Sequence, residues 1–579
     1  MGHQYSAICA AALTCYAAAW GASRGNAVTD APGESTKLDA AALKMPEHPL
    51  APPEYRRPEG YVPRPYEKTL QQLRETYSEG LMAKARAAYA HVEKVIADGK
   101  WKATPEGIDA HTCPEWFQDA KFGIFIDWGL WSLASWAPKK ADGAMYPDWY
   151  EHRMYSDFDA KSPFWGYRSY HVKNWGADFQ RDDFIPLFQA KRFNPEALAG
   201  TFRDAGAKYV VPFCKHHSGF CLWDSSFTFR DSADRGPHRD LMGETVRACR
   251  QDGLKFGFYF SLAEWEYPLI GTDGQIANYS WNKTLPYSPD MEVKASGKVA
   301  VRDFVKDYIV PQAVEFIDKY SPDLLWYDGE WSDSAKNLGG YTISAYFYNV
   351  NDGKKEVAVN DRYGNGEPSE IAGKFKQRAR QWLRTVRGDF FTDEFGDTTE
   401  CIDPAKAHPW EACRGISQSF GNNWQDNASN VVTAHEFVCL FADIVARGGN
   451  LLLIVNLDGQ GGLPEIQRQR LLDIGGWLKA YGEAIYATRA VAPFVTPAVS
   501  YTRSKDGRTG YAIIKKLSRE VEVRLAPAEG SAITHLATGE KLAWQYADAA
   551  KTAAVVSLGA LADGDLPIAL KISLNRPQP

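Results

Sequence analysis

Short, continuous apolar runs alternate with amphipathic helical patterns between about residues 115 and 455. The runs are KFGIFID, KYVVPFCKHH, KFGFYFSL, DLLWYD, EVAVND and NLLLIVN, at 121–127, 208–217, 255–262, 323–328, 356–361 and 450–456. The helical patterns lie at 194–207, 243–253, 301–320 and 433–449. Uninterrupted apolar runs that alternate with helices are typical of parallel strands covered on both faces.

This alternation predicts an α/β fold, a (β/α)8-like barrel with insertions. The six apolar runs account for six of the eight strands of such a barrel, and the pattern does not show the other two. The alternative is a doubly wound open sheet. No glycine-rich phosphate loop follows any of the runs, which favours the barrel.

The regions on either side of the barrel have a different pattern. Residues 28–66 are rich in proline and polar residues and predict an extended arm, and residues 67–98 show the apolar spacing of a long helix. A further helix is predicted at 464–486. Short alternating strands then follow at 498–504, 509–516, 520–526, 553–559 and 567–573. We therefore predict an N-terminal arm and helix over 24–110, a catalytic barrel over 111–490 and a C-terminal antiparallel β-sandwich over 491–579.

The first residues have the features of a signal peptide. An alanine-rich apolar stretch at 7–19 is followed by small residues, which predicts a signal peptide over 1–23 and a secreted or periplasmic protein. No later run is long and apolar enough to predict a membrane span. The net charge is −6 and no run of Lys and Arg occurs, which argues against a nucleic-acid partner.

Polar residues stand at the carboxyl ends of the predicted strands. Active sites of (β/α)8 enzymes lie at these ends, so we expect the side chains to share one polar pocket. The end positions are Asp127 with Trp128, His216 with His217, Glu264 with Trp265, Asp328 with Glu330, and Asp361 with Arg362.

The residue types at these ends indicate the chemistry. No GxSxG elbow follows any of the predicted strands, and the sequence has no HExxH helix and no P-loop. Neighbouring residues on a strand point to opposite faces, so we do not expect His216 and His217 to bind one metal ion, and we predict no metal site. Carboxylates surrounded by aromatic residues, which make up 13% of the chain, are the equipment of a glycoside hydrolase.

Several motifs resemble those of a known family. WYDGEW, KHHSGF, KFGIFIDWG, NDRYG and GGNLLL…GWLKAYGEAIY are similar, in order and spacing, to the signatures of the α-L-fucosidases of glycoside hydrolase family twenty-nine. The resemblance covers roughly residues 112–490. It implies a (β/α)8-like barrel with a C-terminal β-sandwich, and a retaining exo-glycosidase that needs no cofactor. The implied substrate is a glycan or a small glycoside.

The resemblance also implies roles for individual carboxylates. Asp328 looks like the nucleophile of the family, and Arg362 resembles the arginine whose charge keeps that nucleophile ionised. Glu330 is interpreted as a supporting residue or as an acidic residue at a helix start. Glu394, in GDFFTDEFGD, resembles the acid/base of many bacterial members, and Glu411, in PWEAC, is the alternative for this role.

Further residues resemble those that hold the sugar. His216 and His217 are similar to the imidazole pair that binds sugar hydroxyls. Tyr146 and Trp149, in MYPDWY, are similar to the loop that closes over the sugar and stacks on its apolar edge.

Two positions depart from the family pattern and raise a question about the sugar. Asp127 stands where the family usually has His, and Asp148 stands where it usually has Glu. A neutral His both donates and accepts hydrogen bonds, whereas an ionised Asp only accepts them. Asp is also shorter than His or Glu, so both replacements leave room beside the sugar. Alternatives to an α-L-fucoside substrate are therefore an α-L-galactoside or an α-L-glucoside. The non-enzymatic alternatives are a carbohydrate-binding protein on a decayed barrel and a polysaccharide-binding scaffold that displays the C-terminal sandwich.

Overall fold

The computed structural model describes most of the chain beyond the predicted signal peptide. The predicted signal peptide, and the first parts of the predicted arm and of the helix predicted at 67–98, lie outside the described residues. These residues are 48–63, 79–138, 145–155, 166–274, 276–279, 297–330, 332–363, 388–394 and 408–575.

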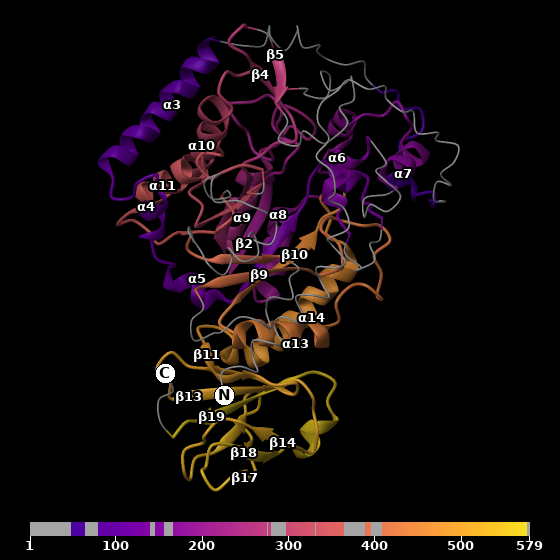
Figure 1. Cartoon of the computed structure of the whole chain (residues 1–579). Helices are drawn as coiled ribbons and strands as arrows, with labels where there is room; N and C mark the ends of the chain where they lie inside the picture. Colours follow the sequence, from indigo (N-terminus) through magenta and orange to yellow (C-terminus); the bar gives the residue numbers. More distant parts are fainter. Residues whose placement is uncertain are drawn as a thin grey trace, which may run out of the picture. The chain divides into compact units, whose positions relative to one another are not determined.

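Eight parallel strands form the core of the molecule (Figure 1). They pair in chain order, and a parallel bridge between Asn360 and Phe390 joins the two edge strands, β7 and β8, so that the sheet closes on itself. This confirms the predicted barrel. The strands are β1 (Phe122–Asp127), β2 (Tyr209–Lys215), β3 (Lys255–Ser261), β6 (Leu324–Asp328), β7 (Ala358–Val359), β8 (Phe391–Glu394), β9 (Trp410–Gly415) and β10 (Asn450–Asn456).

The helices predicted between the strands are present. The helix predicted at 301–320 differs: a π-helical turn, η7 (Val305–Ile309), comes first, and the α-helix begins just before Pro311, which has no N–H to donate to a preceding turn. The larger helices are α3 (Glu79–Asp98), α8 (Pro195–Asp204), α9 (Leu241–Gln251), α10 (Val310–Tyr320), α11 (Gly340–Asn351), α13 (Ala434–Ala446) and α14 (Glu465–Tyr481).

Shorter elements lie outside the regular alternation. The hairpin after β3 was not predicted. These elements are α4 (Pro105–Asp109), α5 (Glu115–Ala120), η3 (Leu130–Leu133), η4 (Pro147–Trp149), α6 (Tyr150–Arg153), α7 (Tyr167–Asn174), η5 (Arg181–Leu187), and the hairpin β4 (Tyr267–Ile270) with β5 (Ile276–Tyr279).

The two strands missing from the sequence pattern are β8 and β9. Their sequences, FTDE and WEACRG, contain charged residues in place of a continuous apolar run. These charged residues interrupt the apolar pattern, which explains why the pattern did not reveal β8 and β9. Glu394 is the last residue of β8.

Aromatic side chains fill the middle of the barrel. Phe125, Phe213, Tyr259 and Trp326 come from β1, β2, β3 and β6, and the rings of Phe213 and Tyr259 are stacked with centroids 3.9 Å apart. Side chains from neighbouring strands that meet in layers make such a barrel a solid core. Truncation of one of these large rings to Ala is expected to cost about 3–5 kcal/mol of stability.

Antiparallel strands follow the barrel. They form a six-stranded and a three-stranded sheet that share one hydrophobic cluster, as predicted for a sandwich. Helix α13 packs against β11 and β12, and Trp477 donates a 2.7 Å hydrogen bond to the carbonyl of Pro567. The strands are β11 (Arg489–Val495), β12 (Val499–Arg503), β13 (Thr509–Ile514), β14 (Glu520–Val523), β15 (Ile533–His535), β16 (Lys541–Leu542), β17 (Trp544–Tyr546), β18 (Ala554–Ser557) and β19 (Ile568–Ser573).

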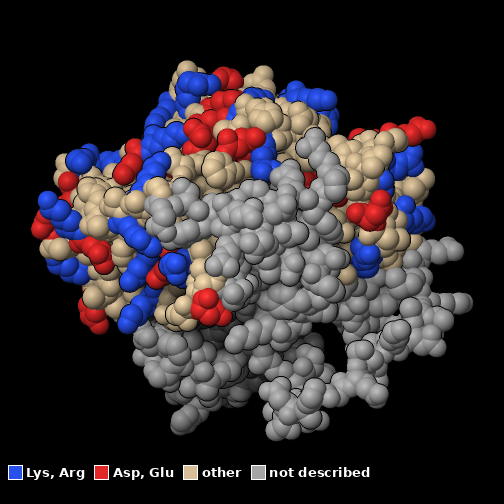
Figure 2. All heavy atoms as spheres, turned by 90° about the horizontal axis from the view of Figure 1, so that it is seen from above, with Lys and Arg blue, Asp and Glu red and all other residues tan. Residues whose placement is uncertain are grey.

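The surface of the described part has mixed charge. Basic and acidic side chains are interspersed on the face seen in Figure 2, without a large area of one sign among the coloured atoms. Among the described residues, no helix has both the length and the apolar character needed to cross a bilayer.

Candidate active site

The backbone holds Asp328 rigidly at the carboxyl end of β6. Gly329 follows with φ +95°, and a Cβ at this position would come within 3.0 Å of the Cβ of Ala263. Glycine therefore permits the turn that leaves the strand. The Gly329 N–H donates a 2.9 Å hydrogen bond to Oδ1 of Asp328. A strand end and a tight turn together leave this carboxylate little freedom.

Two side chains complete the environment of Asp328. Arg362 Nη2 donates to Oδ1 at 2.7 Å, and the Tyr259 hydroxyl donates to Oδ2 at 2.6 Å. Three donors stabilise the carboxylate anion and fix its orientation. Sequence reasoning missed Tyr259. The signal was its register on β3, where Tyr259 pairs with Trp326 and the next inward residue, Ser261, pairs with Asp328.

One guanidinium group connects three carboxylates. Besides Asp328, Arg362 binds Glu330 through Nε at 3.1 Å and Glu394 through Nη1 at 2.7 Å. Burial alone would lower the pKa of Arg362, but the three carboxylates outweigh burial and raise it. Arg362 also lies over the ring of Trp326, 5.2 Å from the centroid. The structure therefore brings Asp328, Glu394 and Arg362 together at one end of the barrel.

Glu330 and Glu394 differ in their environments. Burial raises the pKa of Glu330 to about 8, against the opposing effect of Arg362. The side chain of Glu394 is 36% exposed, compared with 21% for Glu330. Glu394 is therefore the carboxylate of this group with the better access to solvent.

Glu411 lies at the opposite end of the barrel. It is the second residue of β9 and pairs with Asn450, the first residue of β10. Its fully buried carboxylate accepts hydrogen bonds from Tyr209, the first residue of β2, and from Trp326 Nε1 at 3.0 Å. The indole of Trp326 thus contacts Glu411 on the amino-terminal side of Asp328. The structure does not bring Glu411 to the group around Arg362.

Glu411→Gln is expected to leave catalytic activity within a few-fold of the unmodified protein and to change the pH dependence of stability. Burial raises the pKa of Glu411 to about 7. Because this exceeds the value in the unfolded chain, the contribution of Glu411 to the free energy of unfolding is full below about pH 4.5 and is lost as the pH rises to 7. The contribution of Glu411 makes the free energy of unfolding, measured with urea, lower at pH 8 than at pH 5. In the variant this decrease should be smaller by roughly 2–3 kcal/mol. A well-folded Glu411→Gln protein with almost no activity would instead make Glu411 a catalytic residue.

His216 and His217 lie just beyond β2 and their rings meet, with centroids 4.2 Å apart. The expectation that they point to opposite faces was wrong, because the strand ends at Lys215 and the chain turns after it. His217 Nδ1 is 2.5 Å from the Ser261 hydroxyl, and its Nε2 is 3.6 Å from Oδ2 of Asp328. Burial lowers the pKa of both imidazoles, which keeps them neutral. Ligand atoms of the two His and Asp328 lie within 4.8 Å of one another, so these residues offer a possible set of metal ligands.

Asp127 and Asp148 form a second, fully buried acidic pair. Trp131 Nε1 donates a 2.9 Å hydrogen bond to Oδ1 of Asp127, and His216 Nε2 lies 3.8 Å from Oδ2 of Asp148. Burial raises the pKa of Asp127 to about 7. Burial also raises the pKa of Asp148, and the charges of Asp127, Glu394 and Asp328 raise it further. The expectation that Asp127 is an ionised group that can only accept a hydrogen bond needs correction. Below about pH 7 its carboxyl group carries a proton and can also donate.

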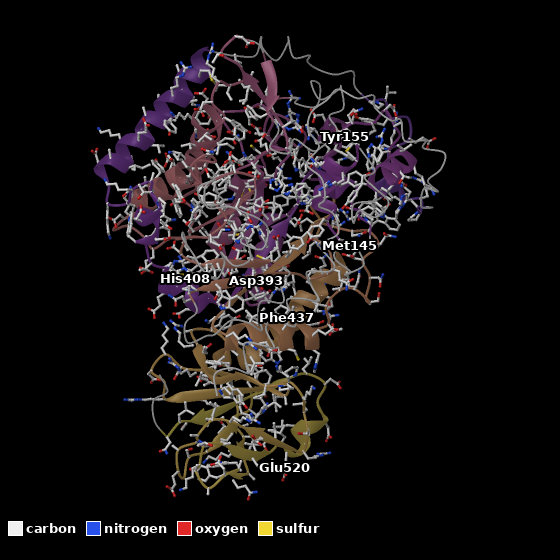
Figure 3. All side chains as sticks on the ribbon, in the orientation of Figure 1. Met145, Tyr155, Asp393, His408, Phe437 and Glu520 are labelled. Atoms are coloured by element: carbon white, nitrogen blue, oxygen red, sulfur yellow. The ribbon has the colours of Figure 1, made fainter. Side chains whose placement is uncertain are left out.

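The loop with Tyr146 and Trp149 lies beside the imidazole pair. The ring of Trp149 is 5.7 Å from that of His217 and 5.9 Å from that of Trp265, and Tyr146 stacks on Phe420 at 5.5 Å. Figure 3 shows Met145 and Tyr155, the ends of this described segment, on the same side of the molecule. Aromatic rings from this loop and from the segment after β3 therefore lie together beside the imidazole pair.

Some strand-end residues do not join this group. The carboxylate of Glu264 binds Lys215 and Lys298, and Asp361 Oδ1 accepts the N–H of Thr392 at 3.0 Å. Each of the five strand ends still contributes to this region, the third through Trp265 and the fifth through Arg362. The carboxylates of Glu264 and Asp361 therefore have lysine or backbone partners of their own.

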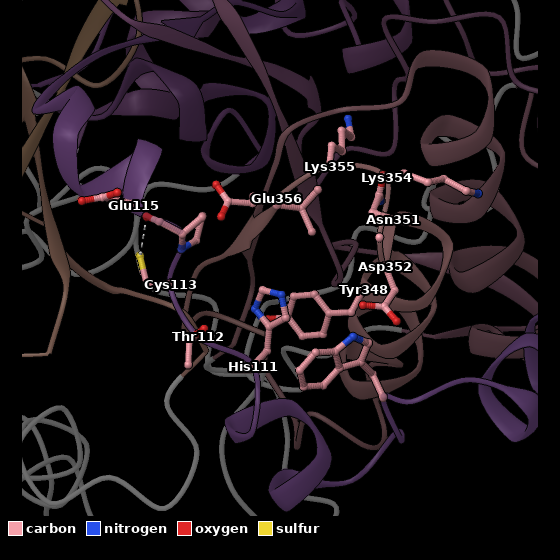
Figure 4. A pocket seen from close by; sticks show the side chains of 14 residues that line it. His111, Thr112, Cys113, Glu115, Tyr348, Asn351, Asp352, Lys354, Lys355 and Glu356 are labelled. Atoms are coloured by element: carbon pink, nitrogen blue, oxygen red, sulfur yellow. Dashed lines mark hydrogen bonds between the residues drawn. The ribbon is translucent and has the colours of Figure 1, made fainter.

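A separate pocket of about 530 Å³ lies near the amino-terminal ends of the strands (Figure 4). It contains the stacked rings of His111 and Tyr348, and His111 Nδ1 is 2.7 Å from the buried carboxylate of Asp389. Val357, just before β7, and Glu115, at the start of α5, also line it. None of the predicted site residues lines this pocket.

Comparisons with known proteins identify the family. The α-L-fucosidase family model matches residues 88–483. Tissue α-L-fucosidase of Bos taurus is 32% identical over 390 residues, 67% of this chain and 72% of the relative. Plasma α-L-fucosidase of Homo sapiens is 32% identical over 425 residues, 72% of this chain and 79% of the relative.

Solved structures agree as well. The crystal structure of Thermotoga maritima α-fucosidase is 30% identical, has a TM-score of 0.64 and covers 82% of this chain and 100% of its own. The same protein in complex with fucose has a TM-score of 0.63. On the family match and these relatives, the chain belongs to the α-L-fucosidase family of glycoside hydrolases.

Proposed function

We propose that the protein is a retaining exo-α-L-fucosidase that releases a terminal α-L-fucosyl residue from a glycan or a small glycoside. Asp328 is the nucleophile and Glu394 is the acid/base. The observation that carries this proposal is the pair of 2.7 Å hydrogen bonds from Arg362 to these two carboxylates. Both Nη atoms are attached to one carbon, so groups bound to them stay a few ångströms apart, which suits the separation of about 5–5.5 Å in retaining enzymes.

In the first step, Asp328 Oδ attacks the anomeric carbon while the bond to the leaving oxygen breaks. Glu394 gives its proton to that oxygen, and a covalent fucosyl-enzyme forms with the anomeric configuration inverted. Arg362, Tyr259 and the Gly329 N–H orient Asp328 before attack. Such preorganisation lowers the barrier because the groups need not reorient during the reaction.

In the second step, Glu394 removes a proton from a water molecule, which attacks the anomeric carbon and breaks the ester to Asp328. The sugar leaves with its original α configuration. The ester removes the negative charge of Asp328, so Arg362 then interacts with Glu330 and Glu394 alone among these carboxylates.

The proposal is tested by following nitrophenyl α-L-fucoside hydrolysis by proton NMR in the first minutes, before the product anomers equilibrate. The proposal predicts that α-L-fucose appears first. Initial formation of β-L-fucose, or no release of nitrophenol, would contradict it.

A related α-L-glycoside with an extra hydroxyl is the second candidate substrate. The specific observation is that Oδ2 of Asp127, Oδ1 of Asp148 and Nδ1 of His216 are buried and have no hydrogen-bond partner among the described residues. Unpaired buried polar atoms are costly, so a bound sugar is expected to supply partners. An α-L-galactoside adds a 6-hydroxyl to the fucoside, and an α-L-glucoside also changes the configuration at C4.

Asp127→His is expected to shift selectivity toward the fucoside. The replacement removes the carboxylate that can pair with an additional hydroxyl, so the ratio of kcat/KM for nitrophenyl α-L-galactoside to that for the fucoside should fall at least ~10-fold. The three nitrophenyl α-L-glycosides are compared with both proteins. An unchanged ratio would show that Asp127 does not determine the choice of sugar.

We also propose export of the protein, because of the signal peptide predicted at 1–23, which lies outside the described residues. Sequencing the amino terminus of the mature protein tests this. Cleavage close to residue 23 is expected, and protein that stays in the cytoplasm with Met1 intact would contradict the proposal.

A further inference from the structure

A buried ionic cluster lies directly behind the two imidazoles. Glu264 follows β3, and its carboxylate is fully buried between the fully buried ammonium groups of Lys215, at 3.1 Å, and Lys298, at 2.7 Å. The Tyr308 hydroxyl donates a third hydrogen bond at 2.8 Å. Burial would raise the pKa of Glu264, but the two lysines outweigh it and lower the pKa, which keeps the carboxylate ionised.

Burying such a group is expensive. Ions removed from water lose several kcal/mol each, and a buried ion pair is often no more stabilising than apolar residues of the same size. Stability alone is therefore a weak explanation for the Lys215–Glu264–Lys298 cluster. Its contacts with the turn that carries His216 and His217 suggest another one.

The cluster touches this turn at both ends. Lys215 is the last residue of β2 and directly precedes His216, so its hydrogen bond to Glu264 anchors the start of the turn. At the other end, Gly219 has φ +75°, and a Cβ there would lie 2.3 Å from Oε2 of Glu264. The carboxylate is thus packed against the backbone of the turn, at a distance that only glycine permits.

The backbone next to Glu264 also holds the turn. The Trp265 N–H donates a 2.9 Å hydrogen bond to the carbonyl of His217. The Trp265 ring lies 5.5 Å from His216 and 5.9 Å from His217. Lys298 fixes this segment from its other side, because its ammonium group donates to Oε2 of Glu264 and to the carbonyl of Glu266 at 2.6 Å.

We propose that Glu264 is a positioning residue that sets the His216–Gly219 turn and the Trp265 ring against the sugar. This inference rests on the proposed function, in which His216 and His217 bind the sugar. Glu264 itself touches no reacting atom. A displacement of such a turn by about 1 Å can change turnover as much as ~100-fold.

Glu264→Gln tests this inference because it keeps the size of the side chain and removes its charge. The inhibition constant of L-fucose is measured against nitrophenyl α-L-fucoside, together with KM and Tm. We expect the inhibition constant and KM to rise by about tenfold or more. An inhibition constant does not depend on the fraction of folded enzyme, so a purely structural role would lower Tm and leave it unchanged.

Asp443→Asn is the matched control. Asp443 forms an ion pair with the buried Lys515, where α13 meets the strands after the barrel. This variant is expected to lower Tm and to leave the inhibition constant of L-fucose within twofold of the unmodified protein.

Lys298→Met decides the question if Glu264→Gln does not fold. It removes one partner of Glu264 and leaves Lys215 and Tyr308 in contact with the carboxylate. A smaller rise of the inhibition constant, in the same direction, is expected. A folded variant of either kind with an unchanged inhibition constant overturns the inference, while absence of fucoside turnover in the unmodified protein would contradict the proposed function instead.

Discussion

Asp328→Gly is expected to reduce hydrolysis of nitrophenyl α-L-fucoside at least ~10⁴-fold, as removal of a covalent nucleophile does in other enzymes. The glycine leaves space at the end of β6 beside Arg362 and Tyr259, whose hydrogen bonds now hold the carboxylate. Azide can enter this space and attack the anomeric carbon. Added azide should therefore restore turnover and give β-L-fucosyl azide, the product of a single displacement.

Asp393→Asn is a suitable control for this variant. Asp393 lies on β8 next to Glu394, but its carboxylate forms an ion pair with Arg414 at 2.8 Å. Activity close to that of the unmodified protein is expected. Hydrolysis at the original rate by Asp328→Gly would exclude Asp328 as the nucleophile, and loss of stability with intact turnover would indicate a purely structural role.

Glu394→Ala is expected to lower kcat/KM by about 10²–10⁴-fold on fucosides with poor leaving groups, because the leaving oxygen then departs without a proton. Fucosides with very good leaving groups need no acid and should lose much less in the first step. Azide should again accelerate turnover. The product should now be α-L-fucosyl azide, since azide attacks a fucosyl-enzyme whose anomeric carbon is already inverted once.

Glu330→Gln separates the two carboxylates that share Arg362 with Asp328. The pKa of Glu330 is raised to about 8, so an acid role for Glu330 would place the loss of activity at high pH near this value, and the variant would abolish that limb. We expect Glu330→Gln to keep the dependence on leaving group of the unmodified protein. If the Glu330 variant, and not the Glu394 variant, loses activity mainly on poor leaving groups and forms α-L-fucosyl azide, Glu330 is the acid/base.

The strands that could be predicted from the sequence are those whose side chains are apolar on both faces. NLLLIVN and DLLWYD read as buried parallel strands and become β10 and β6. The carboxyl-end rule then directs attention to Asp328, His216 and Arg362 without any structural information. Patterning failed at β8 and β9, because the polar residues that give these strands their chemistry interrupt the apolar runs.

The contacts that join distant segments could not be predicted. Nothing near Lys298 in the sequence indicates that it pairs with Glu264, because the two residues are 34 positions apart. The meeting of the His216 and His217 rings was likewise hidden, since it depends on where β2 ends. The register of β3 and β6 would have revealed Tyr259. Ser261 pairs with Asp328, and Tyr259 lies two residues earlier on the same face of β3.

The most direct measurement is mass spectrometry of the protein after reaction with a 2-fluoro-substituted fucosyl fluoride, which forms the fucosyl-enzyme but slows its hydrolysis. Retaining catalysis through Asp328 predicts one added fluorofucosyl group per chain, located on the peptide that contains Asp328 and absent from Asp328→Gly. A label on another carboxylate would contradict the account. So would hydrolysis of the reagent without inactivation of the enzyme and without a covalent adduct.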